Sequence, residues 1–169
     1  MRLASGSILV AAVRTGMARD RSRVLRTYAI LAALLSLFVA VLLLLALPGW
    51  VAQTDGSTAT LMLSPAVLLL GGIGVIAGLM LPLLRVRKRL PEAGERSQQE
   101  AIYGAVGYAF VLALYVGLLI SAPAEYVEET SSIVQPAVDA LNALNPVLGL
   151  VPPMAIIGLL ALVDRRFSD

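Results

Sequence analysis

Four long runs of apolar and small residues, none of them interrupted by a charged side chain, dominate this sequence. They cover residues 27–54, 56–84, 101–124 and 140–163. Each run exceeds the roughly 20 residues that an α-helix needs to cross about 30 Å of hydrocarbon. One Arg or Asp at the centre of a membrane helix costs about 2.5 to 3.5 kcal/mol, so charge-free runs of this length are typical of membrane spans. We therefore predict four transmembrane helices, over residues 28–48, 61–84, 103–121 and 146–163.

Positive charge flanks these runs on one side only. All 13 Lys and Arg residues lie before the first run, between the second and third, or after the fourth, in residues 2–26, 85–96 and 165–166. The charged residues of the other two connections are all acidic: Asp55, Glu125, Glu128, Glu129 and Asp139. By the positive-inside rule, both termini and the middle loop are expected to be cytoplasmic. The pattern predicts a multi-pass protein of the plasma membrane.

The basic segment 1–26 precedes the first span and has an amphipathic pattern. On a helix, Val10, Val13 and Met17 lie near one another, while Arg19 and Arg23 fall on a different side. We expect a helix on the inner membrane surface, where each arginine near anionic lipid adds about 1 kcal/mol of attraction. A flexible basic tail that only sets topology is the alternative. The cations expected to contact lipid headgroups are Arg19, Arg23, Arg26, Arg85, Arg87, Lys88 and Arg89.

Small residues in the second and third spans indicate close helix packing. Lipid is as apolar as leucine, so helices in a bilayer associate mainly where small side chains let their backbones approach. Glycines of the second span share one side of the helix, and alanines of the third span form an i, i+4 ridge. We predict that these two faces pack together, or pack against a second copy of the chain. The residues are Gly71, Gly74, Gly78, Ala105, Ala109 and Ala113.

Polar and helix-breaking residues are sparse within the spans. Tyr108 and Tyr115 share a face of the third span, and a phenol in lipid needs a hydrogen-bond partner, so both are expected to point into the bundle. Asn142 and Asn145 precede a fourth span that the prolines at 152–153 should bend sharply. These four polar residues form a possible polar lining. Bonding of the phenols to neighbouring carbonyl groups is the structural alternative.

Five further side chains carry smaller predictions. Tyr28 and Trp50 are expected at the two headgroup levels of the first span, because amphipathic rings favour the membrane interface. Ser36 should bond back to its own helix. Ser97 and Glu100 have the spacing of a capping box at the start of the third span, where Glu100 is read as an exposed carboxylate beside the loop arginines.

The composition narrows the chemistry. The 169 residues contain no cysteine and no histidine, so disulfides, thiolate nucleophiles, imidazole bases and ordinary zinc or haem ligation are excluded. No carboxylate pair or nucleophile with a base falls inside a predicted span. We therefore predict no catalytic residues, no cofactor and no metal site. Because the basic residues flank spans, they do not indicate nucleic-acid binding.

The sequence as a whole predicts an all-α, polytopic membrane protein. Residues 1–26 form the N-terminal amphipathic segment, and residues 27–164 form a four-helix, up-down transmembrane bundle with a short outer interfacial helix over 133–144. Residues 165–169 form a cytoplasmic tail. The expected function is that of a non-catalytic structural, scaffold or accessory subunit, in a homo-oligomer or a larger membrane assembly of cellular or viral origin. A small channel or carrier subunit for an uncharged or weakly polar solute is the alternative.

Overall fold

The computed structural model describes residues 4–53, 58–90, 97–121 and 135–167, and every regular element in these ranges is helical. The all-helical prediction is therefore confirmed for the described residues. In chain order the helices are α1 (Ala4–Met17), α2 (Arg23–Gln53), α3 (Thr58–Arg89), α4 (Ser97–Ser121), α5 (Gln135–Asn142), the 3-10 helix η2 (Pro146–Leu150) and α6 (Val151–Arg166).

Four helical segments of the described chain are long and apolar enough to cross a membrane. They are Arg23–Ala46, Leu68–Arg89, Ser97–Ser121 and Pro146–Arg166, with 21 to 25 residues each. These segments correspond to the four apolar runs of the sequence. The chain therefore has the helix lengths and hydropathy of a multi-pass membrane protein.

The chain divides into two compact units, Met1–Gly104 and Ala105–Asp169. The boundary falls inside α4, so the first turns of that helix belong to the first unit and the remainder belongs to the second. No feature of the hydrophobic pattern predicted this division, because α4 is one continuous apolar helix. Each unit is described separately below.

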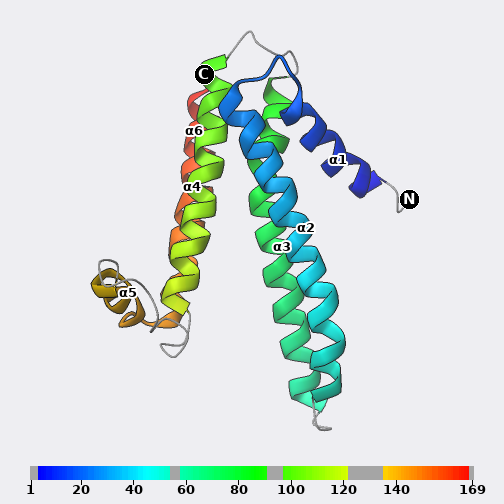
Figure 1. Ribbon diagram of the computed structural model, residues 1–169, viewed down its shortest axis with the longest axis vertical. Helices are drawn as coiled ribbons and strands as arrows, with labels where there is room; N and C mark the ends of the chain where they lie inside the picture. The colour runs from blue at the N-terminus through cyan, green and yellow to red at the C-terminus, as the bar shows by residue number, and fades with distance from the viewer. Residues whose placement is uncertain (1–3, 54–57, 91–96, 122–134, 168–169) are drawn as a thin grey trace. The chain divides into compact units, whose positions relative to one another are not determined.

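In the first unit, α2 and α3 pack side by side as an antiparallel pair, and α1 crosses them at an angle (Figure 1). Two contacts fix the register. The Tyr28 hydroxyl of α2 donates to the Leu79 carbonyl oxygen of α3 at 2.5 Å, and Gly72 of α3 lies against the side chain of Leu43. The core gathers at the cation-rich end of this pair. Its most buried side chains include Leu25, Tyr28, Leu79, Leu83, Val86 and Tyr103.

In the second unit, the later turns of α4 pack against η2 and the first turn of α6. Gly117 and Gly149 face each other so closely that a Cβ atom on either one would overlap the carbonyl oxygen of the other. The Ser121 hydroxyl donates to the Pro146 carbonyl oxygen at 3.0 Å. Contacts pair later α4 residues with earlier η2 and α6 residues, so the two helical segments run antiparallel.

Prolines interrupt the helices less than their helix-breaking character suggests. Pro82 is buried inside α3, which continues to Arg89 without stopping there. Pro152 and Pro153 lie in the first turn of α6, where a missing backbone N–H removes no intrahelical hydrogen bond. The expected bend within a fourth helix is instead a junction between the 3-10 helix η2 and α6.

The predicted outer helix appears as α5. It covers Gln135–Asn142, inside the predicted range 133–144, and Pro136 lies in its first turn. Its side chains pair along the helix, since Gln135 donates to the Asp139 carboxylate at 2.9 Å. Residues 133 and 134 of the predicted range lie outside the described residues.

Candidate functional site: a buried charge pair at the basic end of the first unit

The turn between α1 and α2 places a serine at the start of α2. Ser22 acts as the helix cap, since its hydroxyl oxygen accepts a hydrogen bond from the backbone N–H of Leu25 at 3.3 Å. Its carbonyl oxygen accepts the backbone N–H of Arg26 at 3.0 Å. Serine is favoured here because its short side chain reaches a donor that the first helical turn leaves unpaired. The turn also fixes the backbone of Arg21 and so directs its side chain.

Glu100, from the first turn of α4, closes the site on one side. One carboxylate oxygen accepts Arg21 Nη1 at 2.7 Å, and the other accepts the backbone N–H of Ser22 at 2.8 Å. The Arg21 and Glu100 side chains are 2% and 1% exposed. The carboxylate therefore also sits at the N-terminus of α2, where the positive end of the helix dipole favours an anion.

The end of α3 closes the site on the other side. Arg21 Nη2 donates to the carbonyl oxygen of Leu90 at 2.7 Å, and the backbone N–H of Leu90 donates to Val86 at 2.8 Å. One guanidinium thus joins the α1–α2 turn, the last turn of α3 and the first turn of α4. A buried pair of this kind stabilises little in total, but removal of one partner leaves an uncompensated charge. The pair specifies which helix ends meet.

Tight packing supports the pair. Gly104 of α4 lies against the backbone of α2, and an added Cβ would stand 3.0 Å from both the nitrogen and the Cα of Leu25. At Gly16 of α1, an added Cβ would stand 2.8 Å from the Cβ of Ala29 and 2.9 Å from a methyl group of Leu83. Glycine lets each backbone approach its neighbour at these two crossings.

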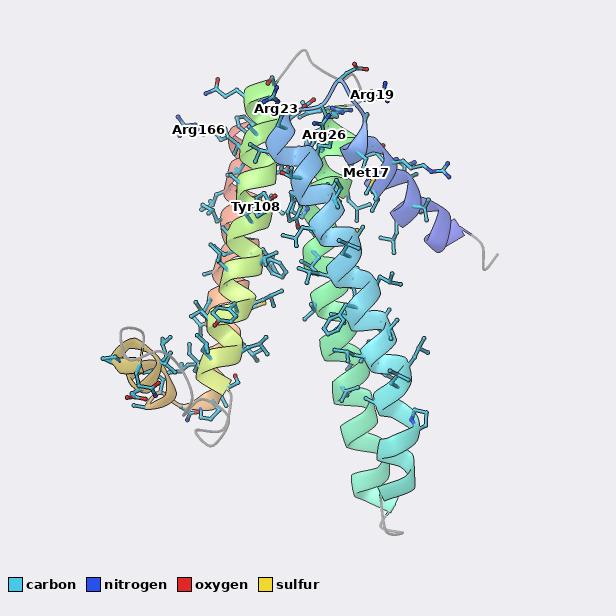
Figure 2. The ribbon with its side chains drawn as sticks, in the orientation of Figure 1. Met17, Arg19, Arg23, Arg26, Tyr108 and Arg166 are labelled. Atoms are coloured by element: carbon cyan, nitrogen blue, oxygen red, sulfur yellow. The ribbon has the colours of Figure 1, made fainter. Side chains whose placement is uncertain are left out.

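Exposed cations surround this buried site. Arg14, Arg19 and Arg23 are exposed, and Arg26 is half-buried. Figure 2 labels Arg19, Arg23 and Arg26, which lie together around the α1–α2 turn. On α3, Arg87, Lys88 and Arg89 are exposed and Arg85 is half-buried. Arg87 Nη1 donates to the carbonyl oxygen of Ile8 in α1 at 3.2 Å. The seven predicted headgroup contacts therefore gather at one end of α2 and α3.

The predicted glycine face divides into two parts. Gly78 is buried, whereas Gly71 and Gly74 are exposed and an added Cβ on either would meet no atom within 4 Å. In the first half of α3, the described glycine that approaches a neighbouring helix closely is Gly72, which lies against Leu43 of α2. On α4, Ala105 is exposed, Ala109 is half-buried and Ala113 is buried. The proposed pairing of the glycine and alanine faces stays a prediction.

The proposed polar lining does not converge on one described site. Tyr115 is 61% exposed, although it was expected to point inward, and Tyr108 is half-buried. Asn145 is exposed and serves as the cap of η2, since its side-chain oxygen accepts the backbone N–H of Val147 at 3.0 Å. Asn142 is the last residue of α5. A transport path lined by these residues stays a prediction.

Smaller expectations concern single side chains. Tyr28 is fully buried and its hydroxyl bonds to α3, whereas its level relative to the headgroups stays a prediction. Ser36 is buried, and its hydroxyl makes no hydrogen bond to any described residue, including its own helix. Glu100 is fully buried and binds Arg21 and Ser22, so it is not an exposed loop carboxylate, and the capping box with Ser97 stays a prediction. Trp50 lies in α2, within Arg23–Gln53.

Sequence reasoning missed the charged residues that the structure buries. The sequence indicates Arg21 only as one of the topology-setting cations and gives no role to Asp164, which follows the last predicted span, yet both are at most 8% exposed. The spacing of Ser22 before an apolar helix could have signalled the cap. Nothing local could have paired Arg21 with a carboxylate 79 residues away. Within the described residues, no group of three His, Cys, Asp or Glu side chains could hold a metal ion.

Across the described residues, fold and site together define a helical chain with four segments suited to spanning a membrane and with a buried Arg21–Glu100 pair that joins three helix ends. The chain belongs to the family described as "Domain of unknown function (DUF8056)", whose model matches residues 3–168. No curated protein and no solved structure gives a significant match. The family assignment covers both units and carries no stated activity.

Proposed function

We propose that this chain is a multi-pass protein of the plasma membrane that acts as a non-catalytic structural, scaffold or accessory subunit. The observation that carries the proposal is the distribution of exposed apolar surface. In the candidate span Arg23–Ala46 only 11% of the most hydrophobic window is buried, and the same share applies to Pro146–Arg166. Large exposed side chains on α2 include Leu34, Leu37, Phe38, Leu44 and Leu45. In water such a surface would drive aggregation, whereas lipid solvates it.

The charges support an orientation with the basic end in the cytoplasm. Arg19, Arg23 and Arg26 lie at the start of α2, and the basic residues of α3 lie at its end, which is the same end of the antiparallel pair. Residues 27–54 contain no cation that would have to cross the membrane. Anionic headgroups of the inner leaflet are the proposed partners of this basic end.

Self-association is the second part of the proposal. Gly71 and Gly74 present backbone to the surroundings with open space beyond each Cα. Such a face lets another helix approach closely. We expect Gly74→Leu to weaken association between copies while leaving the fold of the single chain unchanged, because a Cβ at this position meets no atom of its own chain within 4 Å. Unchanged association in detergent and in lipid would remove the glycine face as an interface between copies.

Cysteine labelling tests the orientation directly, since the natural chain has no cysteine to remove. Ala143→Cys and Gln98→Cys place single thiols at exposed positions near the α5–η2 connection and at the start of α4. A membrane-impermeant maleimide should label Ala143→Cys in intact cells and Gln98→Cys only after permeabilisation. The reverse pattern would overturn the orientation, and labelling of both in intact cells would overturn the membrane-spanning arrangement.

Purification in mild detergent tests the role. A stable complex with other proteins would support an accessory or scaffold subunit and would identify the process. A homo-oligomer that conducts an uncharged solute after reconstitution would favour the channel or carrier alternative and contradict a purely structural role.

A further inference from the structure

α1 has two different sides, and only one of them is used in the fold. Ala12 is fully buried, and Gly16 lies against Ala29 of α2 and Leu83 of α3. At about 100° per residue, Val10 and Met17 fall on another side of the helix. They are 53% and 37% exposed. The helix is therefore docked through its smallest side chains and leaves its larger apolar side chains uncovered.

The docked position puts α1 at the level of the cations. Gly16 lies against Leu83, and the carbonyl oxygen of Ile8 accepts a hydrogen bond from Arg87. These two contacts are eight residues apart in α1 but only about one turn apart in α3. A helix running parallel to α3 would cover about two turns over the same length. α1 thus crosses the end of α3 obliquely, as Figure 1 shows, beside the basic last turn of that helix.

Cations border the uncovered apolar side. Arg14 lies next to Val10 and Met17 on the helix surface, and Arg19 follows in the turn after α1. Both arginines are exposed, and neither has an ion-pair partner among the described residues. Figure 2 shows Met17 and Arg19 close to each other near the end of α1. An apolar strip bordered by arginine is the arrangement that helices use at a membrane surface.

We infer that this corner of the molecule, formed by Val10, Arg14, Met17 and Arg19, is a binding site for anionic phospholipid. Val10 and Met17 enter the boundary between headgroups and acyl chains, and Arg14 and Arg19 bind the phosphate groups. The inference rests on the proposed function, because it requires the basic end of α3 to lie at a membrane surface. It goes further in assigning α1 a lipid-binding side that differs from its docking side.

Single-cysteine variants of the full chain locate α1 relative to lipid. The variants Val10→Cys and Leu37→Cys each carry an environment-sensitive fluorophore. They are reconstituted into vesicles of phosphatidylcholine with about 30% phosphatidylglycerol, which imitates an anionic leaflet. Leu37 is 63% exposed on α2 and serves as the control for membrane insertion. We expect quenching of the Val10→Cys label by shallow lipid-attached quenchers and of the Leu37→Cys label by deep ones.

The two positions separate the two hypotheses. If the Leu37→Cys label is quenched and the Val10→Cys label stays in water, the protein spans the membrane but the lipid site on α1 is wrong. If neither label meets lipid, the proposed function itself fails.

Charge removal tests the headgroup contact. The variant Arg14→Gln with Arg19→Gln is compared with Arg165→Gln and Arg166→Gln, which removes the same charge from exposed positions at the end of α6. Native mass spectrometry measures phosphatidylglycerol retained by each. We expect affinity to fall about fivefold for each arginine removed at the α1 corner, and less in the control. Equal losses in the two variants would contradict a specific site and leave only general attraction between cations and the bilayer.

Discussion

The two units differ in the groups that make their most specific contacts between helices. In the first unit, polar side chains reach between helices, with Arg21 bound to Glu100 and Leu90 and with Tyr28 bound to Leu79. In the second unit, the closest contact is made by residues without side chains, where Gly117 meets Gly149. The first unit therefore adds polar groups that must be present to close glycine contacts such as Gly16 and Gly104, whereas the closest contact of the second unit depends on side chains that must be absent.

This difference matters for a chain in lipid. Leucine burial contributes little to helix association in a bilayer, so hydrogen bonds and close backbone approach supply the specificity. The first unit uses mainly the former and the second mainly the latter. Substitutions at these particular contacts should therefore separate the units: polar truncation at Glu100 or Tyr28 should damage the first, and an added methyl group at Gly117 or Gly149 should damage the second.

The largest effect is expected from Glu100→Ala. It leaves the Arg21 guanidinium buried without its carboxylate, which costs about 3 to 5 kcal/mol of stability. The measurement is unfolding of the purified full chain in mixed detergent micelles, followed by circular dichroism.

A double variant distinguishes a lost pair from a lost fold. Arg21→Met combined with Glu100→Leu removes both charges and should recover most of the stability, since a buried pair and an apolar replacement are often nearly equal in energy. Arg165→Gln, at an exposed position at the end of α6, is the control for charge removal. A Glu100→Ala loss no larger than the Arg165→Gln loss would show that the pair does not hold the helix ends together.

An intermediate effect is expected from Gly117→Ala or Gly149→Ala. Each new methyl group overlaps a backbone carbonyl oxygen on the facing segment, and overpacking of this kind costs about 1 to 3 kcal/mol. Gly158→Ala in α6 is the matched control, because a Cβ there meets nothing within 4 Å. It should stabilise by up to about 1 kcal/mol through helix propensity. Thermal unfolding of the three variants gives the comparison, and similar shifts for Gly117→Ala and Gly158→Ala would contradict the close contact.

The helices themselves could be predicted because their cause is local. The charge-free runs lead to α2, α3 and α4, and the prolines at 152–153 correctly indicated a break in the last segment. The sequence does not indicate where the prolines lie in the helix. Proline is favoured in the first turn of a helix and disrupts a helix interior, and here both prolines lie in the first turn of α6. α5 was predictable from its apolar spacing and from Pro136.

The candidate site could not be predicted because its causes are not local. The Arg21 to Glu100 contact joins residues 79 positions apart. In the sequence each looked like an ordinary charge beside a span, and the burial that distinguishes them comes from how three helix ends meet. Similarly, the alanine ridge of the third span predicts packing against the glycine face of the second span, a pairing that stays a prediction, and it does not indicate the close contact that the structure shows at Gly117. Gly117 packs on Gly149, in a segment whose 3-10 geometry the sequence did not suggest.

A smaller effect is expected from Tyr28→Phe in the first unit. The substitution keeps the ring and removes only the hydroxyl that donates to the Leu79 carbonyl oxygen. Hydrogen bonds between membrane helices contribute about 0.6 kcal/mol on average and about 1.7 at most. Tyr115→Phe, at a position 61% exposed, should change stability less. Equal unfolding midpoints for the two variants would mean that the Tyr28 hydroxyl does not help to join α2 and α3.

The smallest effect is expected from Ser121→Ala in the second unit. Its hydrogen bond to Pro146 is exposed, so water can replace it and the loss should stay below about 0.5 kcal/mol. The same hydroxyl stands where a Cβ on Gly149 would go. In a Gly149→Ala background, Ser121→Ala should therefore become favourable, because it removes one of the atoms that the new methyl group overlaps. A double-mutant cycle measures this change of sign. Additive losses would mean that the Ser121 hydroxyl and the new methyl group at Gly149 do not compete for the same space. The close backbone approach at this crossing would then not limit the second unit.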